Sequence, residues 1–528
     1  MSSKNYYDVT KWNVGNPYED IGEVINSIIA DIKKRQTDSN MNEGGKPGAV
    51  IYIPSGDYHL RTQVVIDISY LKIMGSGHGF VSSSIRYNLP ENEWADLHEV
   101  WPGGSRILVD LSPKPGDEES AGAAFYVERD GNPRISSVEF ENFCIDGLHF
   151  VDDGSGMPNP ENTYTNGKTG IYIGSAQDSF RLTGMGIVYL EHGVTIYHAD
   201  ALSIHDNFIA ECGNCIELRG WGQASKITDN LMGAGYKGYS IFAENFGGLL
   251  ITANNIFPRG TCSVHFRNVA RSIITANRFH SFYPGMLVFE GNCSENMVSS
   301  NHFLRDNEPW APMLEYDNGL DDLYGILCIS GNNNSVIANH ISEIIHTQSI
   351  KPAGAKPVII HIVSGKGNYI SDNHIVATTE ATDEQTKASD SCFSAQVDAL
   401  TTTDKLVALD VTAVLVEKES IQNTMDDHRF YMPLSWNDRC DSSNPANSSI
   451  LYGNSLLLCK KFRKTSWVVC KYRNVSETSG KFCGTKSDDD ENKMYDSYDC
   501  NDHYGICICH DEKCFDRKNL SGSCMDFS

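Results

Sequence analysis

The chain has 528 residues, of which 40% are hydrophobic and 21% charged, and its formal net charge is −25. Such an acidic surface repels the phosphates of nucleic acids and of anionic membranes, so we expect neither as a partner, whereas a neutral polysaccharide is compatible with it. The sequence contains no run of about 18 apolar residues, which excludes a membrane-spanning helix.

The first 150 residues predict one helix followed by irregularly spaced strands. Apolar residues recur at helical spacing over residues 18–34, and we expect this helix to cap the end of the elements that follow. Strand-like segments occur at 49–53 and 71–74, with long loops between the strands. The loop 87–101 contains two tryptophans and is expected to cover a cleft, and residues 160–168 form another polar loop.

The middle of the chain repeats at a period of about 23 residues. Short segments that alternate in polarity and favour β-branched residues end in an asparagine, and these asparagines occupy positions 207, 230, 254, 277, 301, 339 and 373. Such a period indicates a solenoid, and the composition of each segment favours strands over helices. Because a coil of about 23 residues accommodates three short strands and three turns, we predict an all-β parallel β-helix.

The recurring asparagine has a predicted role in this fold. Stacked side-chain amides can hydrogen-bond to one another from coil to coil at a tight turn, which forms an internal ladder. The alternative is that the asparagines only mark surface turns. Each of them follows an isoleucine or valine by two or three positions, and this joint recurrence favours the ladder.

The C-terminal part of the chain has a different composition. The repeat ends near residue 423, and nine of the 16 cysteines lie between residues 440 and 524. This density is typical of a disulfide-stapled module and less often of a metal site. We therefore predict two domains, a β-helix over 1–430 and a Cys-rich tail over 431–528 that is either stapled or disordered. Translated non-coding sequence is the alternative for the tail.

The localisation stays open. Three Asn-x-Ser sequons, at Asn447, Asn474 and Asn519, fit a secreted module. The first residues, MSSKNYY, lack the apolar core of a secretory signal and predict instead a protein that stays in the cytosol, unless a signal has been lost.

Two carboxylates stand out in one coil. Asp206 precedes a ladder asparagine, and if Ile216 and Leu218 point inward, then Cys215 and Glu217 point outward. A bend between the two carboxylates is expected to bring them near each other. Glycosyl transfer needs such a pair, one group to protonate the departing oxygen and one to accept a proton. The alternative, a turn aspartate and a solvated strand glutamate, is not excluded by the spacing alone.

Several long blocks resemble the inulin fructotransferases. The main block is residues 201–230, ALSIHDNFIAECGNCIELRGWGQASKITDN. The others are GIYIG at 170–174, YSIFAEN at 239–245, HSFYPGM at 280–286 and NHFLRD at 301–306. The resemblance extends from about residue 7 to about residue 423, nearly four-fifths of the chain.

This resemblance implies a right-handed parallel β-helix that assembles as a homotrimer with active sites between protomers. It implies an inulin fructotransferase that acts on inulin or fructo-oligosaccharides and releases a cyclic difructose anhydride, III in preference to I. The 3-hydroxyl of the terminal fructose attacks the anomeric carbon of the second fructose and expels O1 of the third, so no water is consumed. Transferases of this family are usually secreted.

The resemblance also assigns the catalytic pair. The essential Asp and Glu of the family stand eleven residues apart in this block, and Asp206 and Glu217 match them. We assign Glu217 as the acid on the leaving oxygen and Asp206 as the base, with the reverse assignment open. The reaction needs no cofactor and no metal.

Two outward columns are candidates for substrate binding. A tryptophan suits the apolar face of a furanose and charged groups suit its hydroxyls, although an ordinary solvated turn column is the alternative. Stepping by 23 residues gives the first column as His198, Trp221, Glu244, Arg267 and Glu290, and Asp200 and Gln223 form the second.

The sequence contains further motifs and allows two alternative functions. Cys212 and Cys215 form a lone Cys-x-x-Cys, which we interpret as small residues that fill the coil, because no second pair follows at zinc-ligand spacing. Acidic runs at 321–322 and 488–491 lack the alternating spacing of a calcium loop. The nearest alternative function is hydrolysis of a difructose anhydride by the same fold and carboxylate pair, and a different one is a non-catalytic β-helix that binds glycans.

Overall fold

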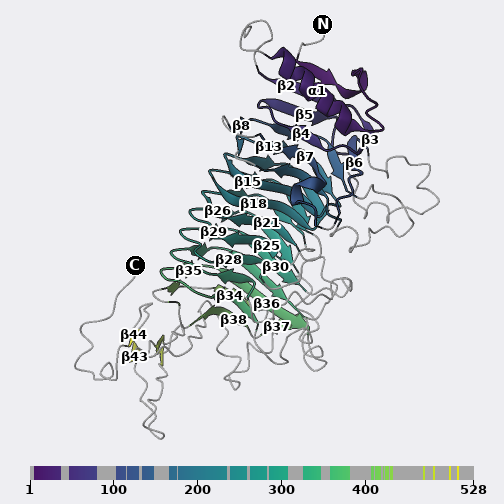
Figure 1. The fold of residues 1–528 in the computed structure, drawn as a ribbon. Helices are drawn as coiled ribbons and strands as arrows, with labels where there is room; N and C mark the ends of the chain where they lie inside the picture. The colour runs from purple at the N-terminus through teal and green to yellow at the C-terminus, as the bar shows by residue number, and fades with distance from the viewer. Residues whose placement is uncertain are drawn as a thin grey trace, which may run out of the picture.

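The computed structural model shows one elongated stack of coils that runs from the N-terminal helix to the last strands of the repeat (Figure 1). The structure describes residues 5–36, 47–79, 103–114, 116–129, 134–147, 166–174, 177–234, 238–257, 262–281, 285–306, 325–345, 357–380, 406–409, 411–417, 420, 423–426, 429–431 and four two-residue strands between 468 and 509. The loop 87–101, most of the loop 160–168 and, apart from those short strands, the Cys-rich tail lie outside the described residues. The proposed domain division therefore stays a prediction.

Three long sheets form the walls of the stack, and each coil contributes one strand to each sheet in turn. The first sheet contains β1 (Tyr6–Asp8), β2 (Ala49–Ile53), β5 (Leu71–Gly75), β9 (Glu139–Glu141), β13 (Arg181–Thr183), β16 (Ser203–His205), β19 (Lys226–Thr228), β23 (Leu250–Thr252), β26 (Ile273–Thr275), β29 (Met297–Ser299), β32 (Ser335–Ile337), β35 (Tyr369–Ser371) and β39 (Thr424–Asp426). The second contains β3 (Gly56–Leu60), β6 (Ser105–Val109), β10 (Cys144–Asp146), β14 (Gly186–Val188), β17 (Phe208–Cys212), β20 (Leu231–Ala234), β24 (Asn255–Ile256), β27 (Arg278–Ser281), β30 (His302–Asp306), β33 (His340–Ile344), β36 (His374–Glu380), β37 (Leu406–Ala408) and β40 (Arg429–Tyr431).

The third sheet contains the longest strands. Its members are β4 (Val64–Ile66), β7 (Ala123–Val127), β11 (Thr169–Ile173), β15 (His192–Asp200), β18 (Asn214–Gln223), β21 (Tyr239–Glu244), β25 (Cys262–Arg267), β28 (Leu287–Glu290), β31 (Leu327–Ile329), β34 (Val358–Ile362) and β38 (Thr412–Val416), with β8 (Ile135–Ser136), β12 (Gln177–Asp178) and β22 (Phe246–Gly247) beside them. In the tail, β41 (Val468–Val469) pairs with β44 (Ile508–Cys509), and β42 (Gly480–Lys481) with β43 (Asp499–Cys500).

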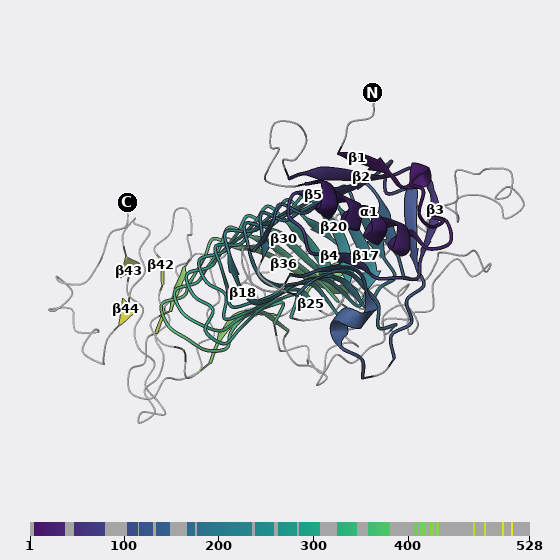
Figure 2. The ribbon, with the colours of Figure 1, turned by 45° about the horizontal axis from the view of Figure 1, so that its top comes forward.

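Nearly all strand pairs of the stack are parallel; β36 and β37 form an antiparallel exception. Successive coils are seen one behind another in the tilted view of Figure 2. The interior is one continuous apolar cluster that the alternation of the strands creates, as in β19, where buried Ile227 lies between outward Lys226 and Thr228. The predicted parallel β-helix is confirmed.

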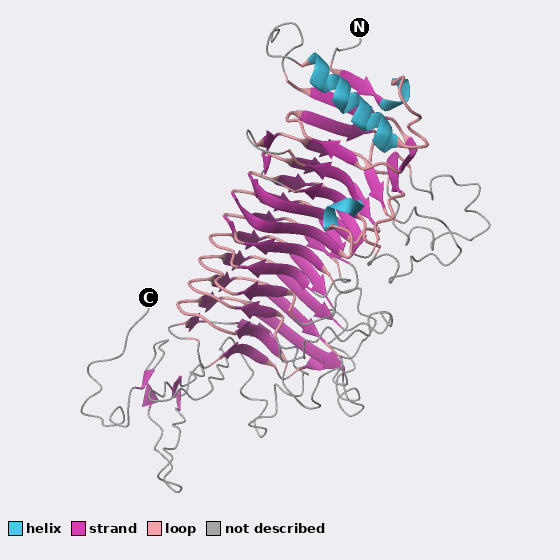
Figure 3. Cartoon of the chain, viewed as in Figure 1, coloured by secondary structure: helices cyan, strands magenta, loops and turns pink. Residues whose placement is uncertain are grey.

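One helix covers the N-terminal end of the stack, as predicted (Figure 3). Helix α1 (Ile21–Arg35) is capped at its N-terminus by Asp20, whose Oδ1 accepts a hydrogen bond from the Gly22 amide at 3.1 Å. Its apolar face packs against β2, β3 and β4 and buries residues such as Ile25 and Ile28, so the first coil does not expose its interior. Among the described residues, the other helical elements are the single turns η1 (Val9–Lys11) and η5 (Glu119–Gly122). Within the described part of the chain, no helix is both long and apolar enough to cross a bilayer.

The predicted asparagine ladder is present at the corner between the first and second sheets. Each side-chain Nδ2 donates to the Oδ1 of the next asparagine at 2.9–3.0 Å, in the order 207, 230, 254, 277, 301, 339 and 373. The same Oδ1 also accepts the backbone N–H of the asparagine one coil earlier, for example Asn230 Oδ1 from Asn207 N at 3.1 Å. A second ladder, which we did not predict, links Asn296, Asn334, Asn368 and Asn423.

The ladder predicts a large stability cost for one substitution. Asn254→Ala leaves buried donors of Asn230 without acceptors, and we expect it to lower the free energy of unfolding by at least about 2 kcal/mol. Thermal unfolding followed by circular dichroism measures this as a lower Tm. The matched control is Asp229→Ala in the preceding turn, whose side chain is exposed and whose counterpart in the next coil is already Ala253. Equal Tm values for the two variants would show that the ladder is not a stabilising element.

Candidate active site

Glu217 lies in the middle of β18 in the third sheet. Its neighbours Ile216 and Leu218 are in the core, so Glu217 points outward, yet only 1% of its side chain is exposed. Three side chains cover it: His192 lies 2.5 Å from Oε2 through Nδ1, Thr195 Oγ1 donates to Oε2 at 3.3 Å, and Arg219 donates to Oε1. The carboxylate is therefore held rigidly by partners from two consecutive coils.

The side chains around Glu217 determine the direction of its pKa shift. Burial raises the pKa of Glu217, but the hydrogen bond from His192 and the positive charges of His192 and Arg219 outweigh burial and leave that pKa below its ordinary value. Burial lowers the pKa of His192, but its hydrogen bond and ion pair with Glu217 leave it raised overall. The two pKa shifts have opposite directions, and each favours the charged form of its residue.

A second carboxylate, that of Glu119, lies beside this His192–Glu217 pair. Glu119, from the turn η5, accepts a hydrogen bond from Tyr197 at 3.3 Å, and Arg219 Nη1 lies 3.4 Å from the same Tyr197 oxygen. The other oxygen of Glu119 is buried without a partner, as is Arg219 Nε. Sequence reasoning missed Glu119, His192, Tyr197 and Arg219. The repeat could have indicated His192, because this residue stands 25 residues before Glu217, in the preceding coil and close to the same column. Glu119 lies before the aligned repeat, so the repeat could not have indicated it.

Asp206 lies at the corner between the first and second sheets. Its backbone has φ 57°, its side chain is exposed, and its Oδ2 is 2.9 Å from Nδ1 of His205. The Nε2 atom of His205 lies 3.1 Å from Thr183 Oγ1. Because Ala253 and Ala276 adopt the same left-handed conformation in their coils, the turn does not require an aspartate.

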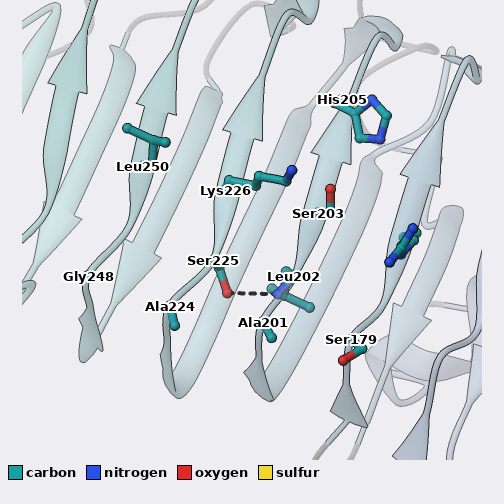
Figure 4. Close-up of a pocket in the computed structure, with 11 residues that line it drawn as sticks. Ser179, Ala201, Leu202, Ser203, His205, Ala224, Ser225, Lys226, Gly248 and Leu250 are labelled. Carbon is teal, nitrogen blue, oxygen red and sulfur yellow. Dashed lines mark hydrogen bonds between the residues drawn. The ribbon is translucent and has the colours of Figure 1, made fainter.

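A shallow hollow of about 590 Å³ lies beside this group on the outer face of the first sheet. Figure 4 shows His205 and Ser203 projecting from one strand and Lys226 from the next. The floor includes Ala201, Leu202, Ala224 and Gly248. The hollow has small and polar walls and neighbours Asp206 through His205, but Glu217 is not part of it.

The expected proximity of the two carboxylates within one coil is wrong. Asp206 faces outward at the corner of the first and second sheets, Glu217 faces outward from the third, and the apolar interior lies between them. Cys215 was also misplaced: it is fully buried, with Sγ 3.5 Å from Ile209 O, because β18 has only just left its turn at this point. Cys212 is buried as predicted, and burial raises its thiol pKa to about 12.

The strand register of the first column differs in part from the predicted one, while its role in substrate binding stays a prediction. Glu244, Arg267 and Glu290 are paired in register. Leu218 pairs with Ala243, the residue before Glu244, and the residue after Leu218 is Arg219, which pairs with Tyr197. The register therefore leads from Glu244 to Arg219 and Tyr197, and not to Trp221 and His198. The physical reason is a bulge, because β18 has one more residue than β15 between these pairs and Ala199–Gly222.

Trp221 belongs to this bulge, and His198 lies next to it. The Trp221 side chain is 44% exposed and its ring lies 5.6 Å from that of His198, whose Nδ1 is buried without a partner. Gly220, at φ 79°, fits under His198, since a Cβ there would lie 2.4 Å from the ring. These two rings form an aromatic ledge on the same sheet as Glu217.

The remaining predicted residues have partners within the protein. The second column is in register, since Asp200 pairs with Gln223. Asp200 accepts the Gln223 amide at 3.1 Å and is bound by Arg134 at 2.9 Å. Glu244 accepts the Gly220 amide at 3.2 Å, and Arg267 bridges to Glu290 at 3.1 Å.

Three ligand-type side chains are close enough to surround an ion in the described part of the chain. Glu119, His192 and Glu217 each offer an atom within 4.8 Å of the others. Two of these three side chains are already bonded to each other, because His192 Nδ1 and Glu217 Oε2 share a hydrogen bond.

The same chain matches proteins of known identity. A family model described as "Beta helix repeat of Inulin fructotransferase" matches residues 300–425, and one described as "Periplasmic copper-binding protein (NosD)" matches residues 122–312. An "Inulin fructotransferase [DFA-I-forming]" from Arthrobacter globiformis is 43% identical over 413 residues, which cover 76% of this chain and 98% of the relative. The chain belongs to the inulin fructotransferase family. The resemblance of the block at 201–230 is thereby confirmed.

Solved structures of another relative are also similar to this inulin fructotransferase homologue. The DFA-IIIase of Arthrobacter chlorophenolicus A6 in complex with GF2 is 66% identical, with a TM-score of 0.71, and the match covers 80% of this chain and 95% of that one. A cysteine-to-alanine mutant of the same DFA-IIIase in complex with DFA-III has a TM-score of 0.70 at the same identity and coverage. The similarity of this homologue to both relatives extends over most of their length.

The aromatic ledge predicts the effect of a glycine substitution. Gly220→Ala drives a methyl group into the His198 ring, and we expect a Tm lower than that of Gly248→Ala, equivalent to about 1–3 kcal/mol of stability. Gly248 is the matched control because its φ is 65° and its nearest foreign atom would be 3.7 Å away, so both variants carry similar backbone strain. Identical Tm values would mean that His198 moves aside without cost.

Proposed function

We propose that the protein converts inulin to a difructose anhydride by intramolecular fructosyl transfer, and that DFA-III is the product in preference to DFA-I. The observation that carries this is the buried Glu217 with its cationic partners on the outer face of a chain of this family. The DFA-I-forming relative supports the reaction class. The DFA-III complex of the 66% identical DFA-IIIase supports the choice of anhydride.

The active site is proposed to lie between protomers of a homotrimer. Asp206 and Glu217 point outward from different faces of one coil, so one small sugar cannot touch both within a single chain. A cyclic assembly places the first-sheet corner of one protomer against the third sheet of its neighbour. The hollow beside His205 then becomes part of the substrate site. Closure by a neighbour also excludes water, which favours the held 3-hydroxyl as the nucleophile.

The sugar is proposed to bind along the third sheet. Trp221 and His198 offer an aromatic face for a furanose, with Gln223 exposed beside them. Three further residues stabilise the shape of this surface, because each already has a partner within the protein: Asp200, Glu244 and Arg267.

Hydrolysis of a difructose anhydride is the second candidate. The specific observation in its favour is the higher identity, 66% against 43%, to an enzyme named for DFA-III than to a DFA-I-forming transferase. The fold and the carboxylate pair are the same, and water replaces the sugar hydroxyl as acceptor.

A product assay separates these functions. The wild-type protein is incubated in parallel with inulin and with DFA-III, and the products are resolved by chromatography. We expect inulin to yield DFA-III without free fructose, because the acceptor is a hydroxyl of the substrate. A linear fructose disaccharide from DFA-III identifies the hydrolase instead. No change in either incubation refutes catalysis and leaves a glycan-binding β-helix.

Mixed assemblies test the shared site. Asp206→Asn and Glu217→Gln should each lower kcat by about 10²–10⁴-fold. Unfolding and refolding the two variants together should restore about one quarter of the wild-type sites, because half of the protomers supply Asp206 and half supply Glu217 in a closed ring. Asp229→Asn, in the corresponding turn one coil on, is the matched control and should stay active. Failure of the mixture to regain activity would mean that both carboxylates act from one chain.

Trp221→Ala tests the sugar-binding ledge. Loss of the stacking surface should raise KM for fructo-oligosaccharides about tenfold with little change in kcat, since an indole ring takes no part in proton transfer. The control is Tyr70→Ala, an exposed aromatic residue near the N-terminal end. An unchanged KM for Trp221→Ala would remove the ledge from the substrate site.

A further inference from the structure

Three histidines form a column on the outer face of the second sheet. His302 of β30 pairs in register with His340 of β33, and His340 pairs with His374 of β36. These strands lie in the C-terminal half of the stack (Figure 1). The residues in register on either side of this histidine column are Arg278 and Arg429. The run of imidazoles is therefore three coils long.

The asparagine ladder fixes the backbone of the histidine column. Each of the three histidines directly follows a ladder asparagine. The His340 amide donates to Asn301 O at 2.8 Å, and the His374 amide donates to Asn339 O at 2.8 Å. Since neighbouring parallel strands lie about 4.8 Å apart, the three side chains leave the sheet at equal steps. The fold itself therefore sets the spacing of the imidazoles.

The three rings touch one another at the surface. The ring centroids of His302 and His340 are 5.0 Å apart and those of His340 and His374 are 4.8 Å apart, in both cases edge to face. His340 is exposed, and its two neighbours are half-buried. Two imidazole nitrogens that bind one ion at about 2.0–2.1 Å lie about 3–4 Å from each other. Touching rings reach this separation by rotation about their side-chain bonds, with the backbone unchanged.

The central imidazole is in the form that binds a metal ion, because metals take neutral imidazole as a ligand. Desolvation lowers the pKa of His340 to about 4, and the charges of His302 and His374 add to this shift. His340 is therefore neutral at neutral pH. The preceding residue of the column, Arg278, is turned away from the rings, since its Nη1 donates to Asn255 Oδ1 at 3.3 Å, one coil earlier.

We propose that the histidine column binds a divalent late transition-metal ion through His340 and one of its two neighbours. The outer rings are two coils apart, so one ion is held either by His302 and His340 or by His340 and His374, with water at its remaining positions. Imidazole nitrogen is a favoured ligand of Ni²⁺, Cu²⁺ and Zn²⁺. The bound ion joins consecutive coils, and the site is independent of the proposed fructosyl transfer.

Chemical modification tests the site residue by residue. Diethyl pyrocarbonate acylates accessible neutral histidines, and peptide mass spectrometry of the full chain reports the rate for each one. Ni²⁺ is the probe, because the thiolates of the cysteine-rich tail prefer Cu⁺ and Zn²⁺. At a Ni²⁺ concentration about ten times the midpoint of binding, the acylation of His340 should slow about tenfold. His59, a partly exposed histidine paired with Asp110 far from the column, is the control and should react at an unchanged rate.

Substitutions separate an ion site from a merely structural stack of rings. The column accommodates asparagine, since Asn255 occupies it two coils before His302. His340→Asn should abolish the Ni²⁺ protection of both His302 and His374, because the two outer rings are too far apart to share an ion. His302→Asn should leave His340 and His374 protected, because that pair is intact.

A thermal measurement completes the test. An ion that binds only the folded chain stabilises it, so saturating Ni²⁺ should raise the Tm of the wild type more than that of His340→Asn. The inference is overturned if Ni²⁺ protects His340 no better than His59, if the outer histidines stay protected in His340→Asn, or if the two Tm shifts are equal. None of these readouts uses inulin or DFA-III, so a failure of the proposed function leaves this test unaffected.

Discussion

The pairing of each coil with the next determines where every outward side chain lies. Parallel strands set neighbouring residues about 4.8 Å apart along the stack, and the asparagine ladder holds that register at the corners. A one-residue slip would exchange the apolar interior for the polar exterior. The contact between His192 in one coil and Glu217 in the next is a product of this fixed spacing.

The third sheet departs from the regularity of the other two. Its strands β15 and β18 are long, they turn through left-handed positions at His198 and Gly220, and β18 contains the bulge with Trp221. Buried polar atoms without partners gather in the same region, including His198 Nδ1, Arg219 Nε and Glu119 Oε1. A bulge and buried polar atoms without partners cost stability, and their occurrence together beside Glu217 is expected where a ligand binds.

Structural features that repeat from coil to coil could be predicted from the sequence, and features that occur only once could not. The ladder, the coil length and helix α1 were predictable because they rest on local periodicity. Trp221 was misaligned because a fixed step of 23 residues assumes coils of equal length, and one bulge breaks that assumption. The predicted outward position of Cys215 was wrong for a related reason. Inward and outward side chains alternate regularly only after a strand has left its turn. Glu119 was unpredictable because η5 lies before the aligned coils, and its contact with Tyr197 is purely tertiary.

In the proposed function, catalysis depends on assembly because Asp206 and Glu217 lie on different faces of the chain. Glu217 is prepared within one chain: its cationic partners are in place and its geometry needs no neighbour. Asp206 is different, because it is exposed and its charge is screened by water until a second surface covers it. In the proposed trimer, one half of the chemistry is permanent and the other half is switched on by burial. The acceptor, a sugar hydroxyl or water, is then decided at the surface that closes over Asp206 and His205, while the group that expels the leaving oxygen stays the same.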